Sequence, residues 1–106
     1  MASRGHKLLT AELRKQLPAL YSQEDKGLDA KVIVKFFSPY SNWTWYATEF
    51  DGTDRFFGLV DGFEQELGYF SLSELEGVTW QGVPGVERDC HWTQRTLKEC
   101  YKKAVA

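Results

Sequence analysis

Two cysteines and two histidines are the residues of this chain that could act as nucleophiles, general bases or metal ligands. They are Cys90, Cys100, His6 and His91. A structural zinc site takes four ligands in closely spaced pairs, and the sequence has neither a CxxC nor an HxxxH pair. Cys90 and His91 are adjacent, so on an extended chain they point to opposite sides and form no nucleophile–base pair. We therefore predict a non-enzymatic protein without a metal or cofactor, and interpret Cys90 as buried and His91 as a surface residue.

Two acidic turns are the other candidates for chemistry, because paired carboxylates can perform acid–base catalysis. They are Asp51 with Asp54, and Asp61 with Glu64. Their spacing does not fit a calcium loop, which needs acids or amides at alternate positions, then a glycine and a later glutamate. Asp51 and Asp61 each precede a glycine, and Asp-Gly is typical of turns. The sequence favours ordinary turns at both places.

Aromatic residues are concentrated in residues 36–70, which hold twelve of the sixteen in the chain. Such a cluster can stack on nucleic-acid bases or bind a protein partner. A small sheet also needs large rings for its core, and we interpret most of these rings as core. Trp43, Trp45 and Tyr46 are the exceptions, because their alternation along a strand places at least one of them near the surface.

The net charge of −2 conceals an uneven distribution of charge. Residues 36–77 contain eight acidic residues and a single basic one, Arg55, whereas the segments before and after have an excess of Lys and Arg. An acidic segment repels a phosphate backbone and suits a basic partner. An ordinary solvated surface is the alternative explanation of the same pattern.

Neither a membrane-spanning segment nor a secretory signal is visible in the sequence. No segment approaches the roughly 20 apolar residues of a transmembrane helix. The N-terminal MASRGHKLLTAELRKQL has no apolar run after its basic residues, and two cysteines make no disulfide framework. We expect a single domain over residues 1–106, with its core at about residues 8–104, in the cytoplasm and away from membranes.

The first element that would position these residues is a helix. A stripe of leucines at three- and four-residue steps predicts a helix that Thr10 caps and that ends near Leu17, before Pro18. The stripe consists of Leu9, Leu13, Leu17 and Leu20. The polar residues 22–30 that follow predict a loop.

β-branched and aromatic segments then predict an antiparallel meander. Its strands are residues 31–37, 42–50 and 55–60, with a short fourth strand at 68–71 and a helical turn or short connection at 63–67. Gly52 can take the positive φ that the turn after the second strand needs. On the second strand, alternation places Trp43, Trp45 and Ala47 on one face and Thr44, Tyr46, Thr48 and Phe50 on the other. Since both faces carry aromatic rings, we expect both to be covered at least in part.

Capping motifs predict a short helix at residues 72–76. Two capping boxes can open it, Ser71 with Glu74 and Ser73 with Glu76. Gly77 suits a positive φ at its end, and residues 77–92 look irregular.

A third capping box, Thr96 with Glu99, predicts a C-terminal helix that continues through Lys102 and Lys103. Strands grouped together with helices at the ends indicate an α+β fold. The expected order is an N-terminal helix, an antiparallel meander of three to four strands, a short helix and a C-terminal helix.

Four segments of the sequence resemble the family catalogued as domain of unknown function 2958. They read VKFFSPYSNWTWYATEFDG, FFGLVDGFEQELGYFSLSELE, ERDCHW and TLKE, and the resemblance extends from about Leu8 to Glu99. It implies a bacterial cytoplasmic accessory protein of plasmids, integrative elements or phages. Such proteins often act on host defence or on DNA transfer, but the resemblance implies no activity and no site residue.

Our first functional hypothesis is a non-enzymatic protein-binding module that inhibits a host defence or nucleic-acid-handling complex through an acidic, aromatic-rich surface. Its partner would have a basic surface. The candidate contact residues are Trp43, Tyr46, Asp51, Asp54, Asp61, Glu64 and Glu66.

Two other functions fit the sequence less well. A binder of single-stranded DNA would use exposed rings and the basic ends of the chain. These basic residues are Arg4, Lys7, Arg14, Lys15, Lys98, Lys102 and Lys103. A small enzyme would use Cys90, His91 or the acidic turns. In any of these cases, an open sheet edge could pair two copies into a homodimer.

Overall fold

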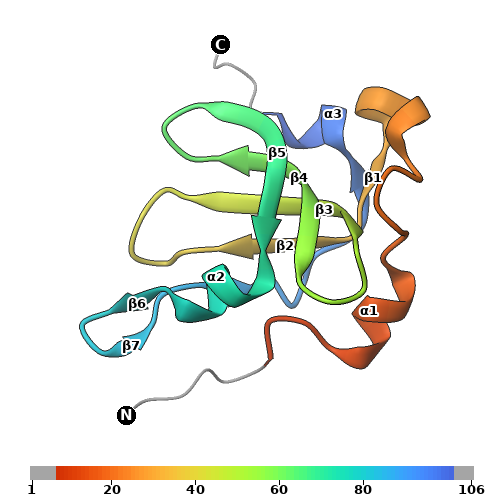
Figure 1. The fold of residues 1–106 in the computed structure, drawn as a ribbon. Coiled ribbons are helices and arrows are strands. Elements are labelled where there is room, and N and C mark those ends of the chain that lie inside the picture. The colour runs from red at the N-terminus through yellow and green to blue at the C-terminus, as the bar shows by residue number, and fades with distance from the viewer. Residues whose placement is uncertain (1–6, 102–106) are drawn as a thin grey trace.

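The computed structural model describes residues 7–101, which form an antiparallel sheet flanked by short helices (Figure 1). The helices are α1 (Ala11–Gln16), the 3-10 helix η1 (Glu24–Asp29), α2 (Leu72–Gly77) and α3 (Leu97–Cys100). The strands are β1 (Lys31–Val32), β2 (Val34–Phe37), β3 (Thr44–Phe50), β4 (Arg55–Asp61), β5 (Gln65–Ser71), β6 (Thr79–Trp80), β7 (Val83–Pro84), β8 (Glu87–Arg88) and β9 (Arg95–Thr96). Arg4, His6 and the predicted helical residues Lys102 and Lys103 lie outside the described part.

The main sheet has five strands in the order β5-β4-β3-β2-β8, and all neighbouring strands are antiparallel. β2 to β5 follow one another in the sequence, and β8 returns to pair with β2. Two small sheets, β1-β9 and β6-β7, complete the architecture. The chain is therefore a mixed helix and strand protein with a mainly antiparallel sheet, as the grouping of strands in the sequence indicated.

Several segments differ from the sequence prediction: η1 lies in the predicted loop 22–30, and β6, β7 and β8 lie in the segment 77–92 that looked irregular. Residues 31–37 do not form one strand, because β1 pairs with β9 while β2 joins the main sheet. Residues 63–67 do not form a helical turn, because β5 begins at Gln65 and pairs with β4 along its whole length. In both places, pairing with a distant or neighbouring strand overrides the local preference of the sequence.

A β-bulge interrupts β3 between Ala47 and Glu49. A bulge adds one residue to one strand, so the side chains beyond it change faces. The prediction from strict alternation that Phe50 lies with Tyr46 is therefore wrong. Phe50 lies with Ala47 in the larger hydrophobic cluster, and Glu49 pairs with Phe57.

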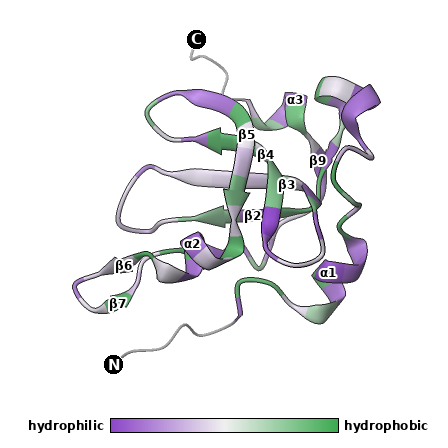
Figure 2. Cartoon of the chain, viewed as in Figure 1, coloured by the Kyte–Doolittle hydropathy of each residue, from purple (hydrophilic) through white to green (hydrophobic). Residues whose placement is uncertain are grey.

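Each face of the sheet carries a hydrophobic cluster. Figure 2 shows that hydrophobic residues, in green, recur along the strands of the sheet. The first face contributes Val34, Phe36, Ala47, Phe50, Phe56 and Phe70, which Leu8, Leu9, Leu17, Leu72, Leu75 and Val86 cover. On the second face, Leu59 packs with Ala30, Val32, Leu97 and Cys100. Trp45 packs against the first cluster and Tyr46 against the second. The expectation that both faces are partly covered is thus confirmed.

Side-chain caps fix the N-terminal ends of α1, α2 and α3 where the sequence indicated. The Thr10 hydroxyl accepts from the Leu13 N–H at 3.1 Å, and the Ser71 hydroxyl accepts from the Glu74 N–H at 3.0 Å. Thr96 and Glu99 form the full capping box that opens α3. Gly77 was expected to end α2 with a positive φ. That detail is wrong, because α2 ends with extended backbone at Val78.

Candidate functional site

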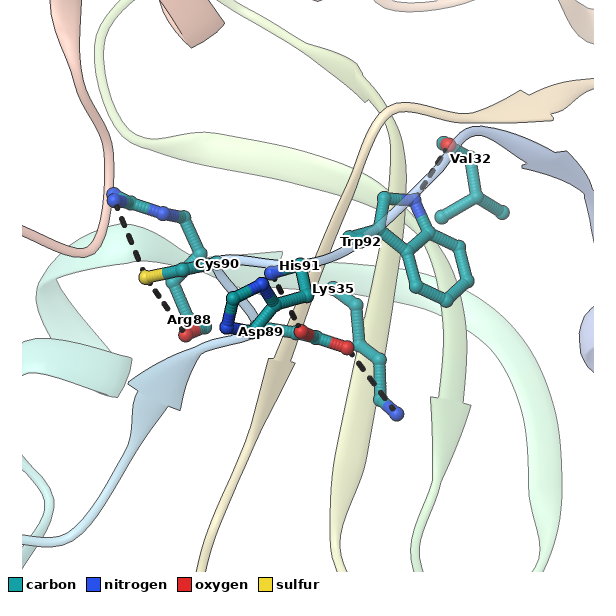
Figure 3. Close-up of polar contacts among 7 residues, drawn as sticks. All are labelled: Val32, Lys35, Arg88, Asp89, Cys90, His91 and Trp92. Atoms are coloured by element: carbon teal, nitrogen blue, oxygen red, sulfur yellow. Dashed lines mark hydrogen bonds and ion pairs between the residues drawn. The ribbon is translucent and has the colours of Figure 1, made fainter.

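Cys90 and His91 lie just after β8, where their polar contacts are with Arg88 and Asp89 (Figure 3). The Cys90 sulfur lies 3.8 Å from an Arg88 guanidinium nitrogen, and the His91 N–H donates to Asp89 at 2.9 Å. His91 is exposed, as expected. Cys90 is exposed as well, which corrects the expectation of a buried thiol. It lies two residues beyond the end of β8, the edge strand of the main sheet.

Cys100 is the buried cysteine of the pair. It lies on α3 in the cluster of the second face, and burial raises the pKa of its thiol to about 11. A thiol with such a pKa is a poor nucleophile at neutral pH. Among residues 7–101, no three His, Cys, Asp or Glu side chains gather where they could hold a metal ion.

Asp51 and Asp54 organise the turn between β3 and β4. One oxygen of Asp51 accepts from the N–H groups of Thr53, Asp54 and Arg55 at 2.8–3.0 Å. These hydrogen bonds, that of Asp54 first, hold the pKa of Asp51 below its usual value. Asp54 accepts from the backbone N–H and the hydroxyl of Ser73 in the first turn of α2. Both carboxylates thus have structural partners, as the interpretation of ordinary turns anticipated.

Asp61, Glu64 and Glu66 belong to the other end of β4 and to the hairpin that leads into β5. Asp61 is buried, and the Gln65 amide donates to it at 3.4 Å. Glu64 and Glu66 are exposed. β4 separates this group from Asp51 and Asp54 by seven residues, or roughly 20 Å of strand. The structure therefore divides the five predicted acidic contacts into two groups.

Trp43 and Tyr46 also lie apart, on opposite faces of the sheet. Trp43 stacks on Trp45 with 6.0 Å between ring centroids. The Tyr46 ring packs 5.8 Å from that of Trp92, and burial raises the pKa of its hydroxyl. A single flat partner surface cannot contact both rings.

Four aromatic residues, Tyr40, Trp43, Phe63 and Trp80, form what we call the aromatic edge. Their grouping was not predicted from the sequence. Phe63 is 94% exposed and meets Trp43 edge to face at 5.4 Å. Tyr40 and Trp80 stack at 5.5 Å, with 8° between the ring planes. Figure 1 shows the three hairpins that carry these residues projecting from the same end of the sheet. In the sequence, an aromatic residue inside a turn could have indicated such an exposed ring. Phe63, for example, directly follows Asp61-Gly62.

A pocket on the second face is another feature that the sequence did not reveal. Its volume is about 340 Å³, and it lies between η1 and strands β3, β4 and β5. Most of its wall is apolar, but the buried carboxylate of Glu49 also lines it.

Among the described basic residues of the nucleic-acid hypothesis, Arg14, Lys15 and Lys98 lie on elements away from the aromatic edge. The Arg14 guanidinium donates to the Gly52 carbonyl at 3.3 Å and lies 5.4 Å from the Phe50 ring. Lys15 and Lys98 are exposed on α1 and α3, away from the aromatic edge in Figure 1. Lys7, the first described residue, is also exposed.

A family model described as "Protein of unknown function (DUF2958)" matches residues 8–106. No curated protein and no solved structure matches the chain. Within residues 7–101, every helix is too short or too polar to cross a membrane.

Proposed function

The chain belongs to the DUF2958 family, whose description names no activity, and from this premise we propose that it is a non-enzymatic protein-binding module that uses the aromatic edge. The observation that carries this proposal is the exposure of Phe63. A phenylalanine that is 94% exposed at the tip of a hairpin contributes nothing to the core. Burying such a ring against a partner is favourable by about 1.5–3 kcal/mol.

The surroundings of Phe63 support a binding role. Its ring rests on Trp43, and a side chain at Gly62 would overlap the Trp43 indole, so the backbone of the hairpin lies directly against this ring. The contact with Trp43 restricts the Phe63 ring, and such restriction lowers the entropy cost of binding. Aromatic residues in such positions commonly dominate the binding energy of protein interfaces.

The charges next to Phe63 favour a basic partner. Glu64 and Glu66 are exposed on the same hairpin. Complementary charges at the rim of an interface speed association and select the partner. The resemblance to accessory proteins of mobile elements points to host defence and nucleic-acid-handling complexes as partners, since these have basic surfaces.

A pull-down from a bacterial lysate tests the proposal. The tagged wild type is compared with Phe63→Ser and with the double variant Glu64→Lys, Glu66→Lys, each with and without nuclease. Leu28→Ser is the matched control, because Leu28 is also an exposed apolar residue, at 44%, but lies on η1. We expect a partner that survives nuclease, is retained by Leu28→Ser and is lost with the other two variants.

Two outcomes would contradict the proposal. Capture that disappears with nuclease would mean that nucleic acid is the ligand, as in the alternative hypothesis. Capture that Phe63→Ser leaves unchanged would exclude the aromatic edge as the contact surface.

Pairing of two copies through the exposed edge strand β5 is a separate prediction. Sedimentation velocity of the purified protein tests it.

A further inference from the structure

The pocket on the second face has the size and the lining of a small-molecule site. Its volume of about 340 Å³ lies within the range of ligand pockets, which starts near 300 Å³. The apolar part of the lining consists of Leu28, Ala30, Phe57, Leu67, Tyr69 and Leu97. Ala30 and Leu97 are buried, whereas Leu28, Leu67 and Tyr69 are 44–47% exposed at the rim. An apolar ligand would cover this rim and gain hydrophobic free energy.

Glu49 places a carboxylate in the wall of this pocket. Only 4% of the residue is exposed. One oxygen accepts from the Tyr21 N–H and the other from the Gln23 N–H, each at 2.7 Å. Both carboxylate oxygens thus accept hydrogen bonds from the backbone.

No cation within the described residues 7–101 forms an ion pair with Glu49. Arg55 lies on the adjoining strand β4, with its guanidinium 5.6 Å from the Tyr69 ring, but it does not line the pocket. Glu24 adds a second, exposed carboxylate to the lining. The pocket therefore has a mostly apolar lining that includes two acidic side chains and no basic one.

The aromatic side chains of Phe57 and Tyr69, which line the pocket, can also attract a cation. Phe57 and Tyr69 meet edge to face at 5.2 Å, and the hydroxyls of Tyr69 and Tyr21 are 3.2 Å apart. The faces of such rings attract a cation that has lost part of its water. A buried carboxylate attracts it further, because the effective dielectric constant is lower than in water.

We propose that this pocket binds a small organic monocation with an apolar body, such as an arylalkylammonium ion. The apolar body lies on Phe57, Leu67 and Leu97, and the ammonium group lies on the side of the pocket lined by Glu49. The site is separate from the aromatic edge and does not depend on the proposed function.

A titration with three small probes tests the role of charge. Phenethylammonium, 2-phenylethanol and 3-phenylpropanoate have similar apolar bodies and carry a positive charge, no charge and a negative charge. Each is added to ¹⁵N-labelled protein, and binding is followed by NMR. We expect amide shifts at Ala30, Leu67 and Leu97, with phenethylammonium binding about tenfold or more tightly than 2-phenylethanol. Equal affinity for amine and alcohol, or no shifts at these residues, would overturn the proposal.

Lysine substitutions at two exposed apolar residues, one at the rim of the pocket and one outside it, test where the probe binds. Leu67→Lys puts a tethered ammonium group at the rim of the pocket, where it competes with the ligand. Val78→Lys makes the same change at a residue that is 40% exposed and outside the pocket. We expect Leu67→Lys to weaken phenethylammonium binding by about tenfold or more and Val78→Lys to leave it unchanged. Undiminished binding by a folded Leu67→Lys protein would place the probe elsewhere and refute the site.

Discussion

The carboxylate of Glu49 accepts a 2.7 Å hydrogen bond from the backbone N–H of Gln23, 26 residues earlier in the chain. Its other oxygen accepts from Tyr21, so one buried side chain ties the segment before η1 to β3. The Gln23 side chain adds hydrogen bonds to the carbonyls of Lys31 and Thr48. Glu49 thus forms a wall of the pocket and also holds the segment that closes it.

Glu49→Leu should destabilise the protein by about 2–5 kcal/mol. The substitution leaves the N–H groups of Tyr21 and Gln23 without an acceptor, and each such loss costs about 1–3 kcal/mol. Urea unfolding followed by circular dichroism measures the free energy of unfolding. Glu24→Leu is the control, because Glu24 is exposed and we expect a change within about 0.5 kcal/mol. Equal effects of the two substitutions would show that the Glu49 hydrogen bonds do not stabilise the fold.

Gly58 and Gly68 face each other across β4 and β5 but should respond differently to alanine. A Cβ at Gly58 would overlap the carbonyl oxygen of Tyr46, whereas a Cβ at Gly68 meets no atom within 4 Å. We expect Gly58→Ala to cost about 3 kcal/mol or more and Gly68→Ala to change stability by less than about 1 kcal/mol. Thermal unfolding of both variants measures the difference. A Gly58→Ala protein as stable as the wild type would contradict the close approach of β3 and β4.

Thr96→Ala should cost about 1 kcal/mol, the usual effect of removing an N-cap side chain. The Thr96 hydroxyl accepts from the Glu99 N–H at 3.3 Å, and the Glu99 carboxylate accepts from the Thr96 N–H at 2.9 Å. Chemical denaturation measures the loss. Thr93→Ala changes an exposed threonine outside any helix and should have no measurable effect, so a similar loss in both variants would argue against the cap.

The turn carboxylate Asp51 should make stability depend on pH in the acid range. Three backbone N–H groups, that of Asp54 first, hold the folded-state pKa of Asp51 below its ordinary value. The resulting stabilisation is complete above the unfolded-state pKa of about 3.9 and is lost as the pH falls through the folded-state pKa. Titration of the Asp51 carboxyl carbon by NMR should give a midpoint below 3.8, the reference value for an aspartate.

Asp51→Asn provides the control for this prediction. The asparagine oxygen can accept the same hydrogen bonds but does not titrate. The stability of the variant should therefore vary less than that of the wild type between about pH 4 and pH 2. Parallel stability curves for the two proteins would contradict the prediction.

The two cysteines should differ in reactivity. Cys90 is exposed, whereas Cys100 is buried with the pKa of its thiol raised to about 11. A colorimetric thiol reagent at pH 8 should modify one thiol in the folded protein and both in urea. The Cys90→Ser variant should show no rapid reaction until it is unfolded. Rapid modification of the folded variant would mean that Cys100 is accessible.

Residue types and their spacing predicted much of the local structure of this protein. The caps at Thr10, Ser71 and Thr96 and the β-branched and aromatic strands depend on interactions within a few residues, which can be inferred from residue types and spacing. The exposed ring of Phe63 could also have been suspected, because an aromatic residue within a turn has no place in the core.

Which residues share a surface depends instead on the tertiary structure. The bulge in β3 moved Phe50 to the first face and Glu49 to the pocket, and β4 separated Asp51 and Asp54 from Glu64 and Glu66. A bulge depends on the register of two strands, and burial depends on what packs above them. These are relations between residues far apart in the chain, so the spacing of residue types does not contain them.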